Sequence, residues 1–398
     1  MNQKAEPGQS ARLLFYVTAL FWCAQYSYTQ YVNPELIRMG ASGLFMGMVA
    51  GAYGFTQMVL RIPLGIMADR IGRQKPFVVI GCLLSALACA GFLVMYTPTG
   101  FLISRGLAGV GSAAWVSFTV LYSAYFPHHE GPRRISHLNA ANMSGRLVGF
   151  FLVLFIIPRL GVKSSFSFSL AAALLAFFLS MTLKEPRHVK QGIRLKDIVL
   201  VARDKYLIAC SIVGILTQVV AFNTYDGFTV NVAKRLGAAD AMLTWLNIAL
   251  LIPTILMNLL LTKTLLARYS ARMLVCVGFI LGAVYCVLVP MTQNMTQLLL
   301  LQILGGSSST LTFGVLIGQS VRDIRQEMRA VAMGFYQAVY GIGMTLGPVL
   351  MGVLIDTSGL DTAFFAVAGF ALLSGVLSYY LLNIPPQQQP ILKEEAYE

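Results

Sequence analysis

The sequence predicts an all-α integral membrane protein whose chain crosses the bilayer many times. Two properties of the whole chain point to this class: 57% of the 398 residues are hydrophobic and only 11% are charged, whereas soluble domains carry about 25% charged residues. The third observation is local. Apolar stretches long enough to cross a hydrocarbon core of about 30 Å as helices recur along the whole chain.

Twelve of these stretches are expected to be transmembrane helices. They lie at residues 12–33, 43–67, 76–97, 100–125, 137–160, 164–183, 206–232, 241–266, 272–291, 295–319, 330–355 and 361–383. Most connections are short, but residues 184–205 form a long one that divides the helices six and six. We therefore expect six-helix bundles at 1–183 and 206–383, a cytoplasmic linker at 184–205 and a disordered, Pro/Gln-rich tail at 384–398. The end of the linker, residues 195–206, fits either an amphipathic helix on the membrane surface or a solvated chain.

The basic residues predict the orientation of these helices. If the N-terminus is inside, 21 of the 29 Lys and Arg residues fall at the inside ends and 5 at the outside ends. Because Lys and Arg gather in cytoplasmic loops, we expect a multi-pass protein of the plasma (inner) membrane with both termini in the cytoplasm. The net charge of +13 then needs no nucleic acid as a partner.

The segment LGIMADRIGRQK, residues 64–75, places one acid among bases and glycines after the second expected helix. Orientation alone explains the bases, but not Asp69 or the glycines. Gly65 lets a second helix approach closely, and Gly72 permits a tight turn. Asp69 can accept hydrogen bonds or face a helix N-terminus. Together with Arg70 and Arg73, these residues are interpreted as a conformational latch between two helical blocks, made in one state and broken in the other.

This segment resembles the loop between helices 2 and 3 of the major facilitator superfamily. RGLAGVGSAA at 105–114 resembles a second motif of that family, with Ala108 where a Gln is usual. The resemblance implies two pseudo-symmetric six-helix halves, a central solute cavity and alternating access by rocking of the halves. The corresponding loop of the second half, residues 262–272, has Ala267 in the place of the acid, so its latch would be weaker.

Charged residues inside expected spans are functional candidates, because burying a charge in a bilayer costs several kcal/mol. Arg61, Arg105 and Arg146 are the bases, and Asp226 is the single acid well inside a span. Arg61 could instead snorkel inward. The resemblance implies proton coupling for Arg105, with structural pairing as the alternative. Asp226 could titrate in proton coupling or only pair near the outer surface. Three bases against one acid favour an anionic solute.

Polar and aromatic side chains complete the expected substrate site. On the first span Gln25, Tyr26 and Thr29 share one helix face. The other candidates are Gln57, Trp115, Asn142, Asn223, Tyr336 and Tyr340. Aromatic residues near span ends also form interfacial belts, so each residue has that alternative. As a set, they favour an organic solute over an inorganic ion.

The leading hypothesis is a secondary active transporter that moves a small organic anion by alternating access, with proton coupling as an option. The alternative is multidrug or metabolite efflux by proton antiport, although Gly145–Arg146 replaces the Gly-Pro dipeptide of the antiporter subset. No catalytic set is present, so we expect no enzyme, no cofactor and no metal. The expected partners are the solute, a proton or other coupling ion and the lipid bilayer, with the chain acting as a monomer.

Overall fold

The computed structural model describes residues 7–126, 131–186, 199–325 and 328–384, and all regular structure in these ranges is helical. The helices up to the linker are α1 (Pro7–Ser27), α2 (Thr29–Arg38), α3 (Gly43–Ile71), α4 (Lys75–Val94), α5 (Pro98–Ala113), α6 (Trp115–Ala124), α7 (Gly131–Leu160) and α8 (Lys163–Met181). Those after it are α10 (Lys205–Asn223), α11 (Thr229–Arg235), α12 (Asp240–Leu260), α13 (Leu266–Arg268), α14 (Ala271–Leu288), α15 (Met295–Ser309), α16 (Val315–Gln319) and α17 (Arg329–Leu381), with π-helical turns at Leu261–Leu265 and Thr310–Gly314.

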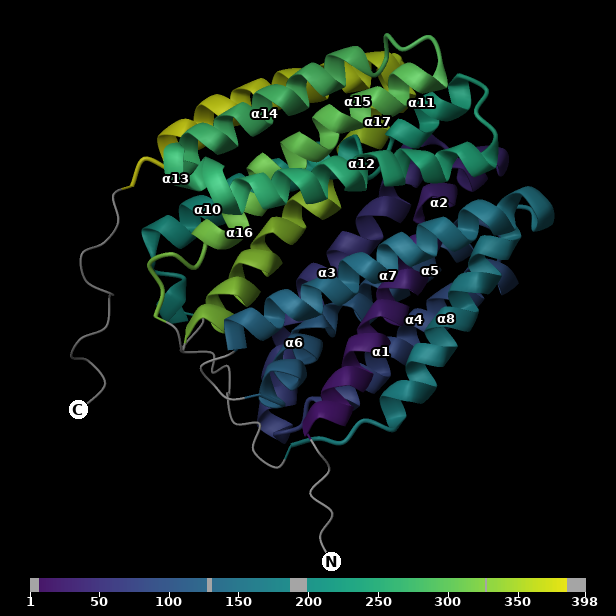
Figure 1. The fold of residues 1–398 in the computed structure, drawn as a ribbon. Coiled ribbons are helices and arrows are strands. Elements are labelled where there is room, and N and C mark those ends of the chain that lie inside the picture. The colour runs from purple at the N-terminus through teal and green to yellow at the C-terminus, as the bar shows by residue number, and fades with distance from the viewer. Residues whose placement is uncertain (1–6, 127–130, 187–198, 326–327, 385–398) are drawn as a thin grey trace, which may run out of the picture.

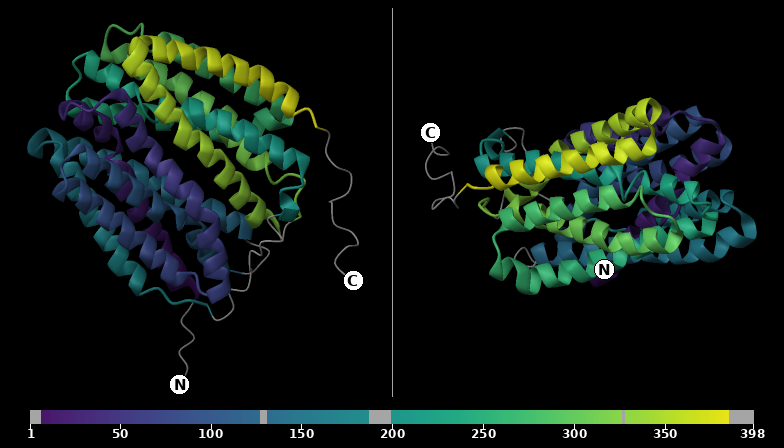
Figure 2. Two further views of the ribbon diagram at one scale, coloured as in Figure 1. Left: turned by 180° about the vertical axis from the view of Figure 1, so that it is seen from behind. Right: turned by 90° about the horizontal axis from the view of Figure 1, so that it is seen from above.

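Among the described residues, ten helices are long and apolar enough to cross a membrane. The all-α membrane class predicted from the sequence is therefore confirmed. One of the ten is α17, which contains the expected segment 330–355 and residues 361–381 of the expected segment 361–383. Gly359 inside it has φ 84° and ψ 165°, and Figure 2 shows the chain folding back near this point. The first expected span is divided into α1 and α2. Most of the linker and the tail, including their expected conformations, lie outside the described residues.

The helices form two groups that meet along a few pairs (Figure 1). Helices α1–α8 pack mainly on one another, and α10–α17 do the same. The groups contact each other chiefly through α3 with α17 and α7 with α12, and also where α2 meets α11 and α12. We call the face with residues 71–75, 181–186 and 199–205 the linker face. The opposite one, with residues 38–43, 161–163 and 236–240, is the distal face.

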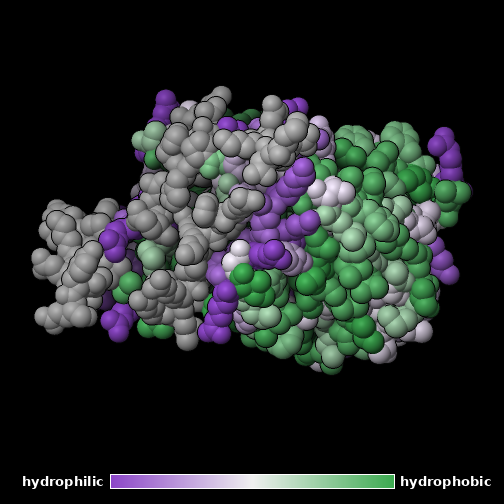
Figure 3. Space-filling model, turned by 90° about the horizontal axis from the view of Figure 1, so that it is seen from below, coloured by the Kyte–Doolittle hydropathy of each residue, from purple (hydrophilic) through white to green (hydrophobic). Residues whose placement is uncertain are grey.

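The outer surface is apolar between these two faces. Figure 3 shows a broad hydrophobic surface with hydrophilic residues near both ends. Large side chains such as Phe155, Phe178 and Leu373 are more than half exposed there. Soluble monomers rarely expose an apolar area of this extent, so the surface suits contact with lipid.

Glycines set the distance between α3 and α17. The Cβ of an alanine at Gly47 would overlap the carbonyl oxygen of Pro348, and one at Gly54 would lie 2.7 Å from Met344. On α17, a Cβ at Gly352 would overlap the backbone of Gly43. These neighbours are mostly backbone atoms, which cannot rotate away. The two helices therefore lie in backbone contact, as small residues allow in membrane helices.

We expect Gly47→Val to destabilise the protein by about 1–3 kcal/mol, because overpacking of a tight contact costs that much. The measurement is the Tm of the purified protein in detergent. Gly369→Ala is the matched control, since a Cβ at that exposed position of α17 meets nothing within 4 Å. Equal Tm values for the two variants would contradict the packing account.

Candidate functional site

Arg105 lies between two tyrosine rings. Its guanidinium carbon is 4.3 Å from the ring centre of Tyr53 and 6.0 Å from that of Tyr28, and its Nη1 donates to the Tyr28 hydroxyl at 3.4 Å. Gly109, one turn along α5, packs on the backbone of Tyr53, which brings α5 against α3 and Arg105 over the ring. Each such cation–π contact contributes about 0.5–2 kcal/mol.

Arg146 has a similar environment on α7. Gly145 packs on the backbone of Ala19 in α1, so the neighbouring Arg146 lies beside α1, with its guanidinium 3.9 Å from the ring centre of Tyr26. Its Nε is buried without a hydrogen-bond partner among the described residues. Arg146 also interacts electrostatically with Asp226 of the other helix group.

Arg61 is the most deeply buried of the three arginines, with 4% of its surface exposed. Its Nη1 donates to the hydroxyl of Tyr340 on α17 at 3.4 Å, across the boundary between the two helix groups. Its Nε has no partner among the described residues. An arginine that snorkels would reach water, so its burial does not agree with the snorkelling alternative. A buried cation that lacks a carboxylate partner carries a desolvation cost of several kcal/mol.

Several of the other predicted substrate-binding residues bond to or pack on the tyrosines beside the arginines. Gln25 donates to Ala108 O and Ser112 Oγ at 3.2 Å and accepts from Tyr28, so it continues the Arg105 network. Gln57 donates to the Tyr53 hydroxyl, and Tyr336 packs on Tyr340. Buried polar atoms without partners in the described part of the chain include Asn223 Oδ1 and the Tyr336 hydroxyl.

Three residues predicted to bind substrate make no hydrogen bond or cation–π contact with the three arginines in the described part of the chain. Trp115 packs on Trp22 and Phe118, inside an apolar cluster rather than beside an arginine. Thr29 begins α2 and donates to the carbonyl of Tyr26 at the break in the first span. Asn142 is half-buried on α7, one turn before Arg146.

Asp226 lies in the non-helical connection between α10 and α11. Its backbone N–H donates to Ala221 O, which holds the turn that follows Thr224 (φ −123°, ψ −102°). The residue is exposed although Tyr225 beside it is buried. Its carboxylate interacts electrostatically with Arg146 of the first helix group.

The expected latch segment forms the hairpin between α3 and α4. Gly72 ends α3 with φ 68°, the left-handed conformation that glycine adopts without strain. Asp69 accepts from Gln74 Nε2 at 2.9 Å. The N–H groups of Gln74 and Lys75 donate to Glu185, so the linker begins by capping α4.

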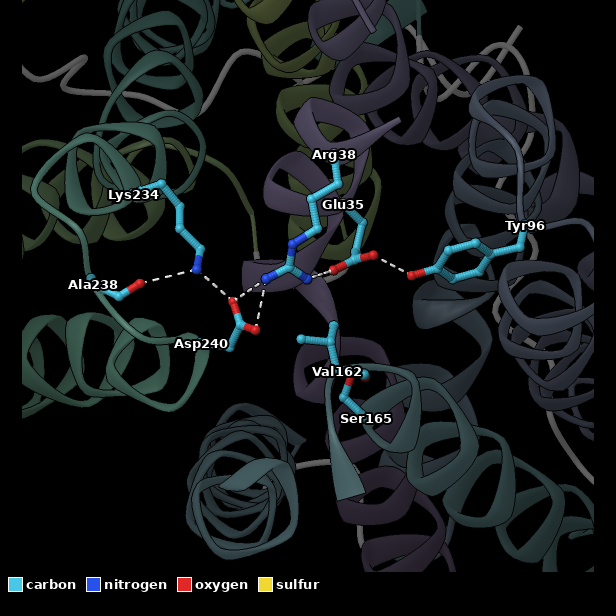
Figure 4. Close-up of polar contacts among 8 residues, drawn as sticks. All are labelled: Glu35, Arg38, Tyr96, Val162, Ser165, Lys234, Ala238 and Asp240. Carbon is cyan, nitrogen blue, oxygen red and sulfur yellow. Dashed lines mark hydrogen bonds and ion pairs between the residues drawn. The ribbon is translucent and has the colours of Figure 1, made fainter. Parts of the chain in front are cut away.

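The distal face carries a network of ion pairs that joins the two helix groups (Figure 4). Arg38 of α2 donates through Nη2 to both oxygens of Asp240 at 2.7 Å. Lys234 Nζ lies 2.5 Å from the same carboxylate. Glu35 pairs with Arg38 and accepts from the Tyr96 hydroxyl. We call these five residues the distal lock.

Sequence reasoning missed the distal lock. It treated Arg38 and Lys234 only as loop bases. For Arg38, a partner 202 residues away along the chain leaves no local pattern. The available signal was the scarcity of acids, which makes Asp240 at the start of a helix unusual. Other bonds across the same boundary join Tyr31 to Thr244 at 2.5 Å and Asn33 to Gly227 O at 3.2 Å. Asp356 of α17 accepts from the N–H groups of Gly43 and Leu44.

A helical membrane protein with two packed helix groups, arginines inside its apolar helices and ion pairs that join the groups has the architecture of a membrane transporter. The sequence profile of the Major Facilitator Superfamily matches residues 14–229 and 214–397. The chain therefore belongs to this superfamily and is a multi-pass membrane transporter rather than an enzyme.

Individual relatives are distant. The chain is 25% identical to an uncharacterised MFS-type transporter of Methanocaldococcus jannaschii, over 86% of this chain and 90% of that protein. It is 24% identical to a putative niacin/nicotinamide transporter of Bacillus subtilis, over 90% of this chain and 88% of the relative. Among solved structures, a nucleoside transporter superposes with a TM-score of 0.79 at 14% identity, covering 94% of this chain and 100% of that chain. At that identity the likeness concerns the fold alone.

Removal of the Asp240 carboxylate is expected to open the distal face more often. The reporter is Gln30→Cys, a position on α2 that is 3% exposed, and the measurement is its rate of alkylation by a membrane-impermeant maleimide. Asp240→Asn should raise the alkylation rate, because it removes the charged hydrogen bonds that join the two helix groups. The increase should be about 2- to 10-fold, because solvent weakens such bonds at this partly exposed site.

The matched control is Asp361→Asn. Asp361 pairs with Arg235 at 2.5 Å on the distal face, but both residues belong to the same helix group. This variant should leave the labelling rate of the reporter unchanged. If both substitutions raise the rate equally, the distal lock does not hold the two groups together.

Proposed function

We propose that the protein is a secondary active transporter for a small organic anion, which binds between the two helix groups. The observation that carries this proposal is the set of three guanidinium groups, Arg61, Arg105 and Arg146, each stacked on or bonded to a tyrosine. None of the three forms an ion pair with a carboxylate of a described residue at ion-pair distance. Their positive charge is therefore available to an anion in a poorly solvated region.

The unpaired polar atoms support an organic anion as the substrate. The Nε atoms of Arg61 and Arg146 are donors that lack a partner, and a carboxylate can accept from guanidinium N–H groups. The tyrosines beside them offer ring faces to an aromatic or heterocyclic body. One relative is named a putative niacin/nicotinamide transporter, and both of these compounds are small organic molecules. In this proposal the three arginines bind the substrate together with the polar and aromatic candidates, which are Gln25, Tyr26, Thr29, Gln57, Trp115, Asn142, Asn223, Tyr336 and Tyr340.

Alternating access supplies the transport step. We infer twelve spans in two six-helix bundles, in which α1 with α2 forms the first span and the two arms of α17 form the last two. The distal lock then closes one end of the substrate path. The latch of Gly65, Asp69, Arg70, Gly72 and Arg73 would close the linker face in the other state. Each closure is a set of bonds that rocking of one bundle can make or break.

The orientation of the chain is proposed from the charge asymmetry: the linker face, with both termini, lies in the cytoplasm, and the membrane is the plasma membrane. A cysteine at Arg73 should react with an impermeant maleimide only in inverted vesicles, and a cysteine at Asp361 only in right-side-out vesicles. The reverse pattern would contradict this orientation.

Uptake of the anion into proteoliposomes should depend on the central arginines. Arg146→Gln and Arg105→Gln should each reduce kcat/KM by about 10- to 100-fold, since a hydrogen bond to a charged group contributes about 1.5–3 kcal/mol. Arg159→Gln is the matched control, because Arg159 is exposed near the end of the same helix as Arg146. Unchanged uptake by both central variants would refute an anion site.

The alternative function is efflux of drugs or metabolites by proton antiport. A multidrug resistance protein of Bacillus subtilis is 23% identical over 87% of this chain and 88% of the relative. Asp226 favours this alternative, because an acid that interacts electrostatically with Arg146 could exchange a proton for a solute, with Arg105 assisting. In the leading proposal the same Asp226 would serve proton coupling of anion uptake.

Asp226→Asn distinguishes the two functions. If the protein exports cationic drugs by proton antiport, the variant should lose proton-driven export, measured as dye accumulation in cells, and neither the wild-type protein nor the variant should bind the anion. If the protein carries an anion, the variant removes a competing negative charge, so anion binding should be retained or strengthened. Loss of anion binding in this variant would contradict the anion proposal.

A further inference from the structure

A second positively charged site lies on the linker face, away from the helix boundary. A hollow of about 230 Å³ is formed where α10 and α14 begin and α16 and α17 end. Its lining includes Tyr206, Ser270, Arg272, Arg322, Leu382 and Asn383. We call it the α14 hollow. None of the residues proposed for substrate binding or for the latch lines it.

Two arginines give the α14 hollow a net positive charge. Arg322 lies 3.7 Å from the ring centre of Tyr206, and its Nε and Nη2 donate to Asp323 at 2.9 Å. Arg272 donates to Asn383 and lies 4.9 Å from the ring centre of Tyr379. No carboxylate within the described ranges pairs with Arg272. The ring contacts and the Asp323 pair hold the two guanidinium groups at the hollow, and one positive charge is left uncompensated.

The position of the α14 hollow matches the level of lipid headgroups. Tyr379 and Tyr380 in the last turn of α17 are 41% and 71% exposed, and Tyr269 just before α14 is 46% exposed. Exposed tyrosines at the end of an apolar helix mark the boundary between headgroups and acyl chains. A phosphate at that depth would lie beside Arg272.

The surface that continues from the α14 hollow is apolar. Helices α14 and α17 pack together. Met273, Val277 and Ile280 on α14 are exposed, and they follow one another at helical spacing. On α17, Leu373 and Val376 are also exposed. A free anion would use only the arginines, whereas an acyl chain could lie along these side chains while its headgroup occupies the hollow.

We propose that the α14 hollow binds the phosphate of an anionic phospholipid, with Arg272 as its principal ligand and Arg322 as the second cation. Basic pockets between membrane helices bind anionic headgroups by this combination of charge and depth. A lipid bound here would join the starts of α10 and α14 to the end of α17 and stabilise that corner of the second helix group. This proposal does not depend on the identity of the transported solute.

The test uses the full-length protein released from nanodiscs that contain phosphatidylglycerol and phosphatidylcholine, with bound lipid counted by native mass spectrometry. The wild-type protein should retain phosphatidylglycerol in preference to phosphatidylcholine. Arg272→Gln should reduce that retention about 10-fold, the effect of losing one charge-assisted hydrogen bond. The matched control, Arg268→Gln, removes an exposed base from the end of α13 that does not line the hollow and should retain the lipid.

Two further measurements keep the test decisive if Arg272→Gln folds poorly. Arg322→Gln should also reduce retention, and phosphatidylglycerol should raise the Tm of the wild-type protein more than phosphatidylcholine does. Equal retention by Arg272→Gln and Arg268→Gln would overturn the proposal. It would also be overturned if inorganic phosphate at millimolar concentration gave the same Tm increase as phosphatidylglycerol, because the site would then recognise a free anion.

Discussion

The backbone contact between α3 and α17 is the constraint on which the rest of the structure depends. Glycines at positions 47 and 352 bring the two helices so close that no Cβ fits between them. This contact places the hydroxyl of Tyr340 within reach of Arg61. At its distal end it places Asp356 at the start of α3.

The charged side chains near the boundary between the two helix groups are the second determinant of the proposed function. Arg61 is buried, so its guanidinium carries a desolvation cost. Cation–π contacts of about 0.5–2 kcal/mol each stabilise the half-buried Arg105 and Arg146. An anion bound beside Arg61 would offset much of its desolvation cost. At the distal face the opposite arrangement holds: Asp240 is shared by Arg38 and Lys234, and Glu35 also pairs with Arg38. Two cations and two carboxylates therefore balance one another there.

The sequence predicted the helical membrane class and selected the three arginines inside the spans, because apolar length and charge inside a span are local properties. It could not predict that Tyr53 lies over Arg105, since this contact depends on how α5 packs on α3. It did not find the distal lock, because Arg38 and Asp240 are joined only when the two helix groups meet. It could not predict that Trp115 packs on Trp22 and Phe118, because one sequence does not reveal which face of a helix meets which neighbour.

The central claim is that the site between the helix groups recognises negative charge on an organic molecule. The most direct measurement is equilibrium binding of small aromatic carboxylates to the purified protein, each compared with its neutral amide, for example nicotinate with nicotinamide. The account predicts that the preferred carboxylate binds at least about 10-fold tighter than its amide, because only the carboxylate makes charge-assisted bonds to guanidinium groups. Equal affinity within every pair, or tighter binding of the amides, would contradict it.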